Sequence, residues 1–402
     1  MNMGHAKTLC LLLIAAALMA PAAGAGNIKV GILDTYSGPP AVFGNDALNG
    51  FKLALEEINR QGVLGGKIEI VTRDDKFKVD IGLNMAKELV LKENVDVIAG
   101  VVNSGVVLAV SDAVAKKEKV PFFTWMGKSE NITGKAGHRY MFSTTENTAM
   151  SGKAAANVLS KKGYKRIWVA GDDYEYGHAL DDSFTRYMKQ LNPGAEFIGR
   201  TWWKLGEPDL VPYFTSIQAA NPDLIHFCTG GASMANVLKT IKATGLNLKV
   251  PIYIHTAIDY AVIKPLGLEA PEGVMGTMDY LFYYPELSTN QKFVKDFQER
   301  YKMPPGFPAF HAYITAHFIA EGFRKAGQVD KEKFIDAVEG IKVDSPVGKI
   351  EMRACDHQAI LPILFGTTKV SKEYGAAIGT DIVTLRGAEV MPSCEEVQAS
   401  RK

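Results

Sequence analysis

The residue types that catalysis requires are present in this sequence, but not at the spacings that catalysis requires. Ser104 lies in the segment VNSGV, which lacks the first glycine of the G-x-S-x-G turn of many serine hydrolases. His311 and His317 are six residues apart, so on one helix they would face different sides and hold no metal ion together. The sequence contains no H-E-x-x-H motif, no G-x-x-x-x-G-K-[ST] loop and no G-x-G-x-x-G after its first strand. We therefore expect neither a catalytic site nor a bound metal or cofactor.

The loops that follow the expected strands carry residues that could bind a small anion. Ser104 is well placed to cap a helix, and its hydroxyl together with the following amide, that of Gly105, could hold a carboxylate. The loop WMGKSE supplies the pair Gly127 and Lys128, and the loop TGGAS contains Gly231. Aromatic residues gather in the loops that follow the expected strands, including 34–45, 172–177 and 255–260, namely Tyr36, Phe43, Trp125, Tyr174, Tyr176 and Tyr260. A plain capping role for Ser104 and a core role for each aromatic residue stay open, but together these loops indicate a ligand pocket.

Hydrophobic periodicity predicts the elements that position these loops. Short β-branched runs such as residues 27–33 and 95–101 are typical of strands, and runs of helical period such as 45–60 lie between them. This succession predicts α/β architecture, with doubly wound parallel sheets covered by helices on both faces. The pattern fills too much chain for one sheet, so we expect two lobes with a break near 143–149. The helical stretch 289–339 should pack on one of them.

Charge and composition exclude several classes of partner. Of the 402 residues, 47% are hydrophobic and 22% charged, as in soluble globular proteins. Lys7 is the one charged residue before position 27, so residues 27–402 carry 44 basic and 44 acidic side chains and no excess that would attract nucleic acid or an anionic membrane. Residues 1–25 combine a basic start, an apolar run and a small-x-small end, which predicts a signal peptide cleaved near Ala25 and a mature protein outside the cytoplasm.

Three cysteines remain after that cleavage, in an oxidising compartment. Cys228 ends an apolar, strand-like run and is expected to be a buried free thiol. Cys355 and Cys394 both lie in turn-rich sequence, and we predict that they form a disulfide, although three pairings are formally open. No C-x-x-C motif or Cys/His cluster suggests zinc.

Several segments, taken together, resemble the type I periplasmic solute-binding proteins of ABC importers, in particular the leucine/isoleucine/valine-binding group. The opening KVGILDTYSGPPAVFGNDALNGFKLALEEINRQGVLGGKIEIVTRDDK is similar to the first βαβ unit of that family. Support recurs in DVIAGVVNSGVVLAVSDAVAKKEKVPFF, GDDYEYGHAL, IKATGL and SPVGKIEMRACDHQAILP. The resemblance covers about residues 27 to 395, and it is the combination that is specific.

The resemblance implies two α/β lobes joined by a three-strand hinge that closes over a ligand. Lobe 1 would comprise residues 27–145 plus 278–343, and lobe 2 residues 146–277 plus 344–402. It also implies a monomeric periplasmic receptor that delivers a small carboxylate-bearing ligand to an ABC permease, with no catalysis and no cofactor. A protein that presents its ligand to a membrane sensor stays open as an alternative, as does an extracytoplasmic hydrolase, which would need a base beside Ser104.

The family's ligand-binding positions carry over residue by residue. Phe43 matches the aromatic residue that covers the ligand, Ser104 the residue that binds its α-carboxylate, and Tyr176 the tyrosine of the second lobe. Gly127, with Lys128 beside it, matches the position that supplies an amide. The two positions at which the family places acids for the ammonium group are neutral here, Thr148 and Thr256. Either Glu146, Asp172 or Asp259 substitutes for them, or the ligand is an aromatic or keto acid without an ammonium group.

Overall fold

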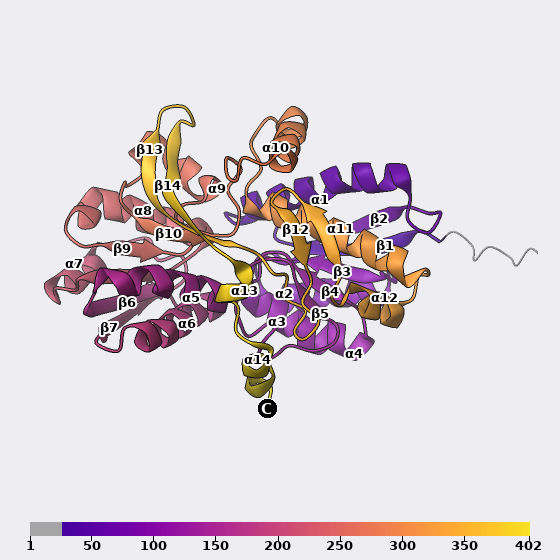
Figure 1. Cartoon of the computed structure of the whole chain (residues 1–402), viewed down its shortest axis with the longest axis horizontal. Coiled ribbons are helices and arrows are strands. Elements are labelled where there is room, and N and C mark those ends of the chain that lie inside the picture. Colours follow the sequence, from indigo (N-terminus) through magenta and orange to yellow (C-terminus); the bar gives the residue numbers. More distant parts are fainter. Residues whose placement is uncertain (1–25) are drawn as a thin grey trace, which may run out of the picture.

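Two α/β lobes, each built on its own sheet, make up the structure (Figure 1). This computed structural model describes residues 26–402, so the predicted signal peptide, residues 1–25, lies outside the described residues. Across 26–402, no helix has both the length and the apolar character needed to cross a membrane.

The first lobe contains a five-stranded, all-parallel sheet of order β2-β1-β3-β4-β5. The elements that build it are β1 (Ile28–Asp34), α1 (Ala41–Gln61), β2 (Ile68–Asp74), α2 (Val79–Leu91), β3 (Val97–Gly100), α3 (Ser104–Val110), α4 (Lys116–Glu118), β4 (Phe122–Thr124) and β5 (Met141–Ser143). Three later helices and a hairpin join this lobe: α10 (Ser288–Tyr301), α11 (Phe307–Ala326), α12 (Lys331–Val338), β11 (Lys342–Ser345) and β12 (Gly348–Glu351).

The second lobe contains a seven-stranded sheet of order β14-β13-β10-β9-β8-β6-β7, in which β13 and β14 run antiparallel to their neighbours. Its first elements are α5 (Thr148–Leu159), β6 (Arg166–Asp172), α6 (Glu175–Leu191), β7 (Glu196–Trp203), α7 (Val211–Ala219), β8 (Leu224–Cys228) and α8 (Gly231–Thr244). They are followed by β9 (Ile252–Ile254), α9 (Tyr260–Ile263), β10 (Met275–Met278), β13 (Ile363–Ser371), β14 (Ala376–Leu385), α13 (Gly387–Val390) and α14 (Cys394–Ser400).

Segments 144–147, 279–287 and 352–362 connect the lobes, because each leaves an element of one lobe and enters an element of the other. Hydrogen bonds tie these crossings together: the Gln358 side-chain amide donates to the carbonyl of Thr145 at 2.6 Å. A disulfide joins Cys355, in the third crossing, to Cys394 at the start of α14, while Cys228 is a buried free thiol.

The parallel α/β fold agrees with the sequence pattern, which left open the lobe that the helical stretch 289–339 joins. Within the expected helical stretch, α11 packs along α1, and the two backbones come so close at Gly50 that a Cβ there would lie 2.0 Å from the carbonyl oxygen of Ala309. The lobe boundaries stay a prediction, and the hairpin β11–β12, which packs beside α11, straddles the boundary expected at residue 343.

Candidate functional site

A cavity of about 240 Å³ lies between the two lobes, at the carboxyl ends of their parallel strands. Ligands of open α/β sheets bind at this edge, because strand ends and helix starts meet there. Six of the ten residues predicted from the sequence line the cavity: Phe43, Ser104, Lys128, Tyr176, Gly231 and Thr256. The wall is otherwise mainly apolar, with contributions from Pro39, Pro40, Phe77, Val102, Met126, Leu205, Val262 and Phe307.

The hydroxyl hydrogen of Ser104 is free to bind a ligand, because both lone pairs of the oxygen already accept hydrogen bonds within the protein. Its Oγ accepts the backbone N–H groups of Lys128 and Ser129 at 3.1 and 3.2 Å. A hydroxyl has two acceptor lone pairs and one donor hydrogen, so the O–H bond is what remains for a ligand. The predicted helix cap at Ser104 is wrong by one residue, since Asn103 is the N-cap and its side chain accepts the amide of Gly105. That bond occupies the Gly105 amide, which does not line the cavity.

Lys128 is the one charged side chain among the described residues that line the cavity. It is 4% exposed, and its Nζ lies 2.5 Å from Glu146 Oε1 in a buried ion pair. The ammonium also lies 4.5 Å from the centre of the Phe307 ring, in a cation–π contact. An ammonium has three N–H donors, and Nζ has no hydrogen-bond partner in the described residues besides Glu146, so the remaining donors are available to an anion in the cavity.

His255 connects Glu146 to the cavity wall. Its Nε2 lies 3.1 Å from Glu146 Oε1 and 3.0 Å from Ser151 Oγ, and its Nδ1 is hydrogen-bonded to the hydroxyl of Tyr176. Burial opposes ionisation of Glu146, but the Lys128 ammonium and the His255 ring outweigh it and hold the pKa of Glu146 well below its usual value. Because Glu146 is ionised, Nε2 carries the hydrogen that it donates, and Nδ1 accepts the O–H of Tyr176.

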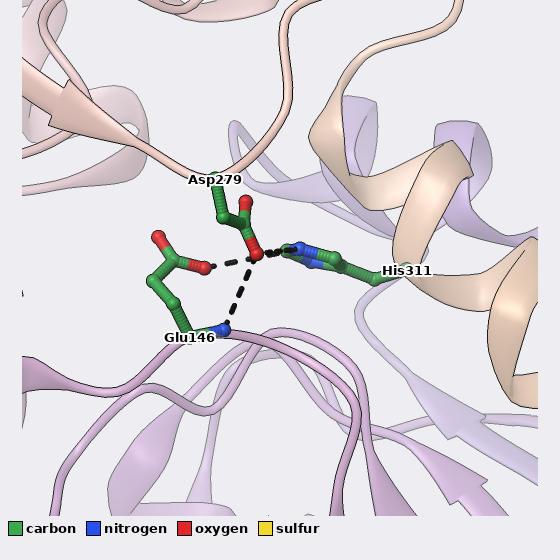
Figure 2. A group of neighbouring side chains, drawn as sticks. All are labelled: Glu146, Asp279 and His311. Carbon is green, nitrogen blue, oxygen red and sulfur yellow. Dashed lines mark hydrogen bonds and ion pairs between the residues drawn. The ribbon is translucent and has the colours of Figure 1, made fainter. Parts of the chain in front are cut away.

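Asp279 and His311 lie on the other side of Glu146 and complete a buried polar cluster (Figure 2). His311 Nδ1 is 2.9 Å from the carbonyl oxygen of Trp125, to which it donates a hydrogen. Its Nε2 lies 2.6 Å from Asp279 Oδ2, a contact that requires a proton on one of the two atoms. Burial, and then the charge of Glu146, raise the pKa of Asp279. Asp279 and His311 therefore share one proton.

Glu146, Asp279 and His311 offer ligand atoms within 4.8 Å of one another, as metal sites do. Two ligands of one tetrahedral zinc ion lie about 3.3 Å apart. His311 Nε2 and Asp279 Oδ2 are 2.6 Å apart and bonded to each other, and the Lys128 ammonium already balances the charge of Glu146. The geometry is that of a hydrogen-bonded ion cluster, and we assign no metal to it.

Trp125, Gly127 and Thr148, which the sequence analysis placed at the ligand, do not line the cavity. Trp125 is fully buried, and its indole N–H donates to Asp34 Oδ2 at 2.8 Å. The Gly127 amide donates to a neighbouring threonine hydroxyl at 2.9 Å. Thr148 begins α5, and its hydroxyl accepts the amide of Glu130 at 3.1 Å. Their polar groups are engaged within the protein, so these three residues are not part of the site proposed below.

No carboxylate lines the cavity among the described residues, although three were candidates for an ammonium partner. Glu146 is paired with Lys128. Asp172 accepts hydrogen bonds from two hydroxyls and one indole of its own lobe. Asp259 is the N-cap of α9, where its side chain accepts the amide of Val262. Each acid is thus engaged elsewhere.

Sequence reasoning missed apolar wall residues such as Phe77, Met126 and Phe307. Phe77 follows the end of β2, a position that the strand pattern could have indicated. Phe307 is different, because it is far along the chain in a loop-to-helix boundary that carries no binding motif. Only the packing of α11 against α1 brings its ring to 6.1 Å from that of Phe43, measured between ring centres.

Comparison with known proteins adds independent information. The family described as "Periplasmic binding protein" matches residues 27–373. The leucine-, isoleucine-, valine-, threonine-, and alanine-binding protein of Pseudomonas aeruginosa is 24% identical over 329 residues, which cover 81% of this chain and 86% of that protein. The Leu/Ile/Val-binding protein homolog 4 of Brucella melitensis biotype 1 is 26% identical over 380 residues, covering 89% of this chain and 88% of that protein.

Solved structures show the same fold. A solute-binding protein of an ABC transporter from Rhodopseudomonas palustris BisB5, in complex with 3,4-dihydroxybenzoic acid, superposes with a TM-score of 0.81 at 23% identity and covers 90% of this chain and 98% of that one. A leucine-, isoleucine-, valine-, threonine-, and alanine-binding protein from Brucella ovis in a closed conformation gives a TM-score of 0.80 at 21% identity, covering 92% and 98%.

Proposed function

Since this chain belongs to the periplasmic binding protein family, we propose that it is a periplasmic solute-binding receptor for a small carboxylate, which it delivers to an ABC-importer permease. The observation that carries this proposal is Lys128, the buried cation on the cavity wall with unused hydrogen-bond donors. An anion is the natural partner for such a group in a site from which water is excluded.

The carboxylate would be held by donors of the first lobe. The Lys128 ammonium supplies charge, and the free O–H of Ser104 supplies a directed hydrogen bond. The rest of the ligand would lie against aromatic side chains of both lobes, with Phe43 and Phe307 on one side and Tyr176 on the other. A cavity of about 240 Å³ suits a small carboxylate ligand. Closure of the lobes over it would give the permease a surface that signals occupancy.

We further propose that the ligand lacks an ammonium group, as an aromatic or keto acid does. A buried ammonium without a carboxylate partner is unfavourable by several kcal/mol, and none of the described carboxylates lines the cavity. Thr256, the one cavity residue at a family ammonium position, is neutral. Relatives of both kinds are known, since the Pseudomonas aeruginosa protein is named for amino acids and the Rhodopseudomonas palustris structure contains dihydroxybenzoate.

Binding rather than turnover is the function that this geometry supports. The hydrogen-bond partners of Ser104 Oγ in the described part of the chain are two backbone amides, neither of which can act as a general base. A hydrolase would need an imidazole or carboxylate at that position.

The test is a thermal-shift and calorimetric comparison of matched ligands. Phenylpyruvate and phenylalanine share the ring and the carboxylate and differ in a keto group against an ammonium group. We expect phenylpyruvate, benzoate or 4-hydroxybenzoate to raise the melting temperature, and phenylpyruvate to bind at least ~100-fold more tightly than phenylalanine, as the unpaired ammonium would require. Stabilisation by leucine, valine and phenylalanine alone would refute this ligand class.

A further inference from the structure

The ionic groups nearest Lys128 balance one another. Lys128 is paired with Glu146, and Asp279 and His311 share one proton between them. All four side chains are buried, from 0% to 4% exposed. A carboxylate that binds beside Lys128 therefore adds one negative charge to a neutral, water-poor cluster. Uncompensated charge in such an environment is strongly unfavourable, so a proton that enters with the ligand would restore the balance.

We propose that His255 takes up this proton, and that its protonation turns the hydroxyl of Tyr176 from a donor to His255 into a donor to the bound carboxylate. The proposal rests on the proposed function, because it requires that the ligand be an anion. It assigns to His255 the role of a positioning residue: the imidazole does not line the cavity, but it sets the direction of the hydroxyl of Tyr176, a residue that does line it.

The hydrogen bonds of His255 make this switch direct. In the structure Nε2–H donates to Glu146 Oε1, and Nδ1 accepts the O–H of Tyr176. A proton from solvent can add only at Nδ1, the nitrogen without a hydrogen. The new Nδ1–H then donates to the Tyr176 oxygen, and the phenolic hydrogen turns toward the cavity. No covalent bond other than this N–H is made, and the added imidazolium charge cancels that of the carboxylate.

Other titratable groups near His255 are less suited to take the proton. The groups that face it are Glu146, Tyr176, Lys128 and His226, with the Asp279–His311 pair beyond Glu146. Glu146 is held ionised by its cationic neighbours, and Asp279 and His311 already hold their shared proton. His226 contacts Phe184 and Tyr253 in the core of lobe 2 and does not line the cavity.

The electrostatic environment of His255 favours uptake of a proton when an anion binds at Lys128. Burial lowers the pKa of His255 below its ordinary value, against the opposing effect of Glu146, so the ring is neutral near neutral pH when the cavity holds no ligand. An anion at Lys128 would offset the ammonium charge, which also lowers that pKa. Binding of a monoanion and binding of a proton at His255 therefore favour each other. A zwitterionic amino acid brings no net charge and would take up no proton.

Calorimetry of the wild-type protein tests this directly. Benzoate is titrated near neutral pH in phosphate, HEPES and Tris buffers, whose ionisation enthalpies differ. The dependence of the observed heat on buffer enthalpy gives the number of protons taken up. We expect about one, and a tenfold loss of affinity for each unit of rising pH over the range in which uptake occurs. Binding with no proton uptake would overturn the proposal while leaving the proposed function intact. Absence of binding by benzoate, 4-hydroxybenzoate and phenylpyruvate would count against both.

Variants identify the group that is protonated. His255→Gln is expected to bind benzoate without proton uptake and with an affinity that no longer depends on pH. His178→Gln is the matched control, because His178 is exposed on α6 and pairs with Asp173 outside the cavity, so uptake should stay at about one. If His255→Gln does not fold, Tyr176→Phe provides the second test: it should weaken binding at least ~5-fold and keep the proton uptake. Unchanged uptake in His255→Gln, or lost uptake in Tyr176→Phe, would assign the proton to another group.

Discussion

Replacement of Lys128 by methionine should affect stability and ligand binding by two separable mechanisms. In the native protein the Lys128 ammonium lies 2.5 Å from Glu146 Oε1, and both side chains are buried. Methionine fills most of the same volume and keeps the contact with the Phe307 ring, but it carries no charge. The change therefore leaves the Glu146 carboxylate buried without its cation, with only the hydroxyl of Thr145 and its imidazole neighbours beside it, and removes the cation from the cavity wall.

The expected losses of stability and of ligand affinity follow from the burial of the Lys128–Glu146 ion pair. Removal of one partner of a buried ion pair lowers the free energy of unfolding by about 3–5 kcal/mol. With an unfolding entropy of roughly 2.1 cal/mol/K per residue over roughly 375 residues, this corresponds to a melting temperature lower by about 5 °C. Loss of a charge-assisted hydrogen bond to the ligand, about 1.5–3 kcal/mol, should raise the dissociation constant for a carboxylate about 10- to 150-fold.

The double variant Lys128→Met/Glu146→Gln separates the two effects. The glutamine is neutral and keeps a side-chain oxygen, so the unpaired charge disappears and most of the lost melting temperature should return. The affinity for benzoate or phenylpyruvate should stay low, because the ammonium is still absent. Melting is followed by circular dichroism and affinity by calorimetry. If the single variant bound these acids as tightly as the wild type, the carboxylate would not lie at Lys128, and the assignment of the site would be refuted.

Three further predictions concern other parts of the site and the fold. Ser104→Ala should weaken carboxylate binding at least ~5-fold by calorimetry and also lower the melting temperature, because two buried amides lose their acceptor; equal affinity would remove Ser104 from the site. Burial raises the pKa of Asp46 to about 7, so the free energy of unfolding is retained at low pH and falls as pH rises from about 4 to about 7. In denaturant titrations the free energy of unfolding of Asp46→Asn, relative to wild type, should therefore rise by up to about 4 kcal/mol between pH 4 and 8, and a pH-independent difference would contradict this. Mass spectrometry of the unreduced protein should find Cys355 linked to Cys394, whose 39-residue separation predicts a loss of about 3–4 kcal/mol on reduction; two free thiols would disprove the link.

The local pattern of the sequence was sufficient for the elements and for part of the cavity. Alternation of β-branched runs and helical runs predicts parallel strands, and parallel strands place their following loops at one edge of the sheet. Residues in those loops, such as Ser104, Lys128 and Tyr176, could therefore be predicted from the sequence alone, and all three line the cavity. The wrong prediction of the helix cap also concerns local structure. Ser104 and Asn103 are both good capping residues, and only the backbone geometry shows that Asn103 is the one that caps.

Which loop residues face inward could not be deduced from position along the chain. Trp125 and Lys128 lie in the same short loop, yet Trp125 turns away from the cavity to donate to Asp34, while Lys128 lines it. Side-chain direction in a loop depends on contacts with distant segments, and loops have no period from which direction follows. The same holds for His255, a buried residue with no motif around it, whose role depends on direct contacts with Glu146 and Tyr176, which lie far away in the sequence.

The sequence by itself determined that this chain is an α/β protein, and that its candidate binding residues lie in the loops after its strands. Those properties depend on composition, periodicity and short motifs, which are local. The tertiary structure decided that, among the residues it describes, the cavity wall has one buried cation and no carboxylate, and that Glu146 connects that cation to two histidines. Charge balance in a buried cluster is a property of atoms brought together from both lobes, and residues 109 positions apart, such as Glu146 and His255, meet only when the chain has folded.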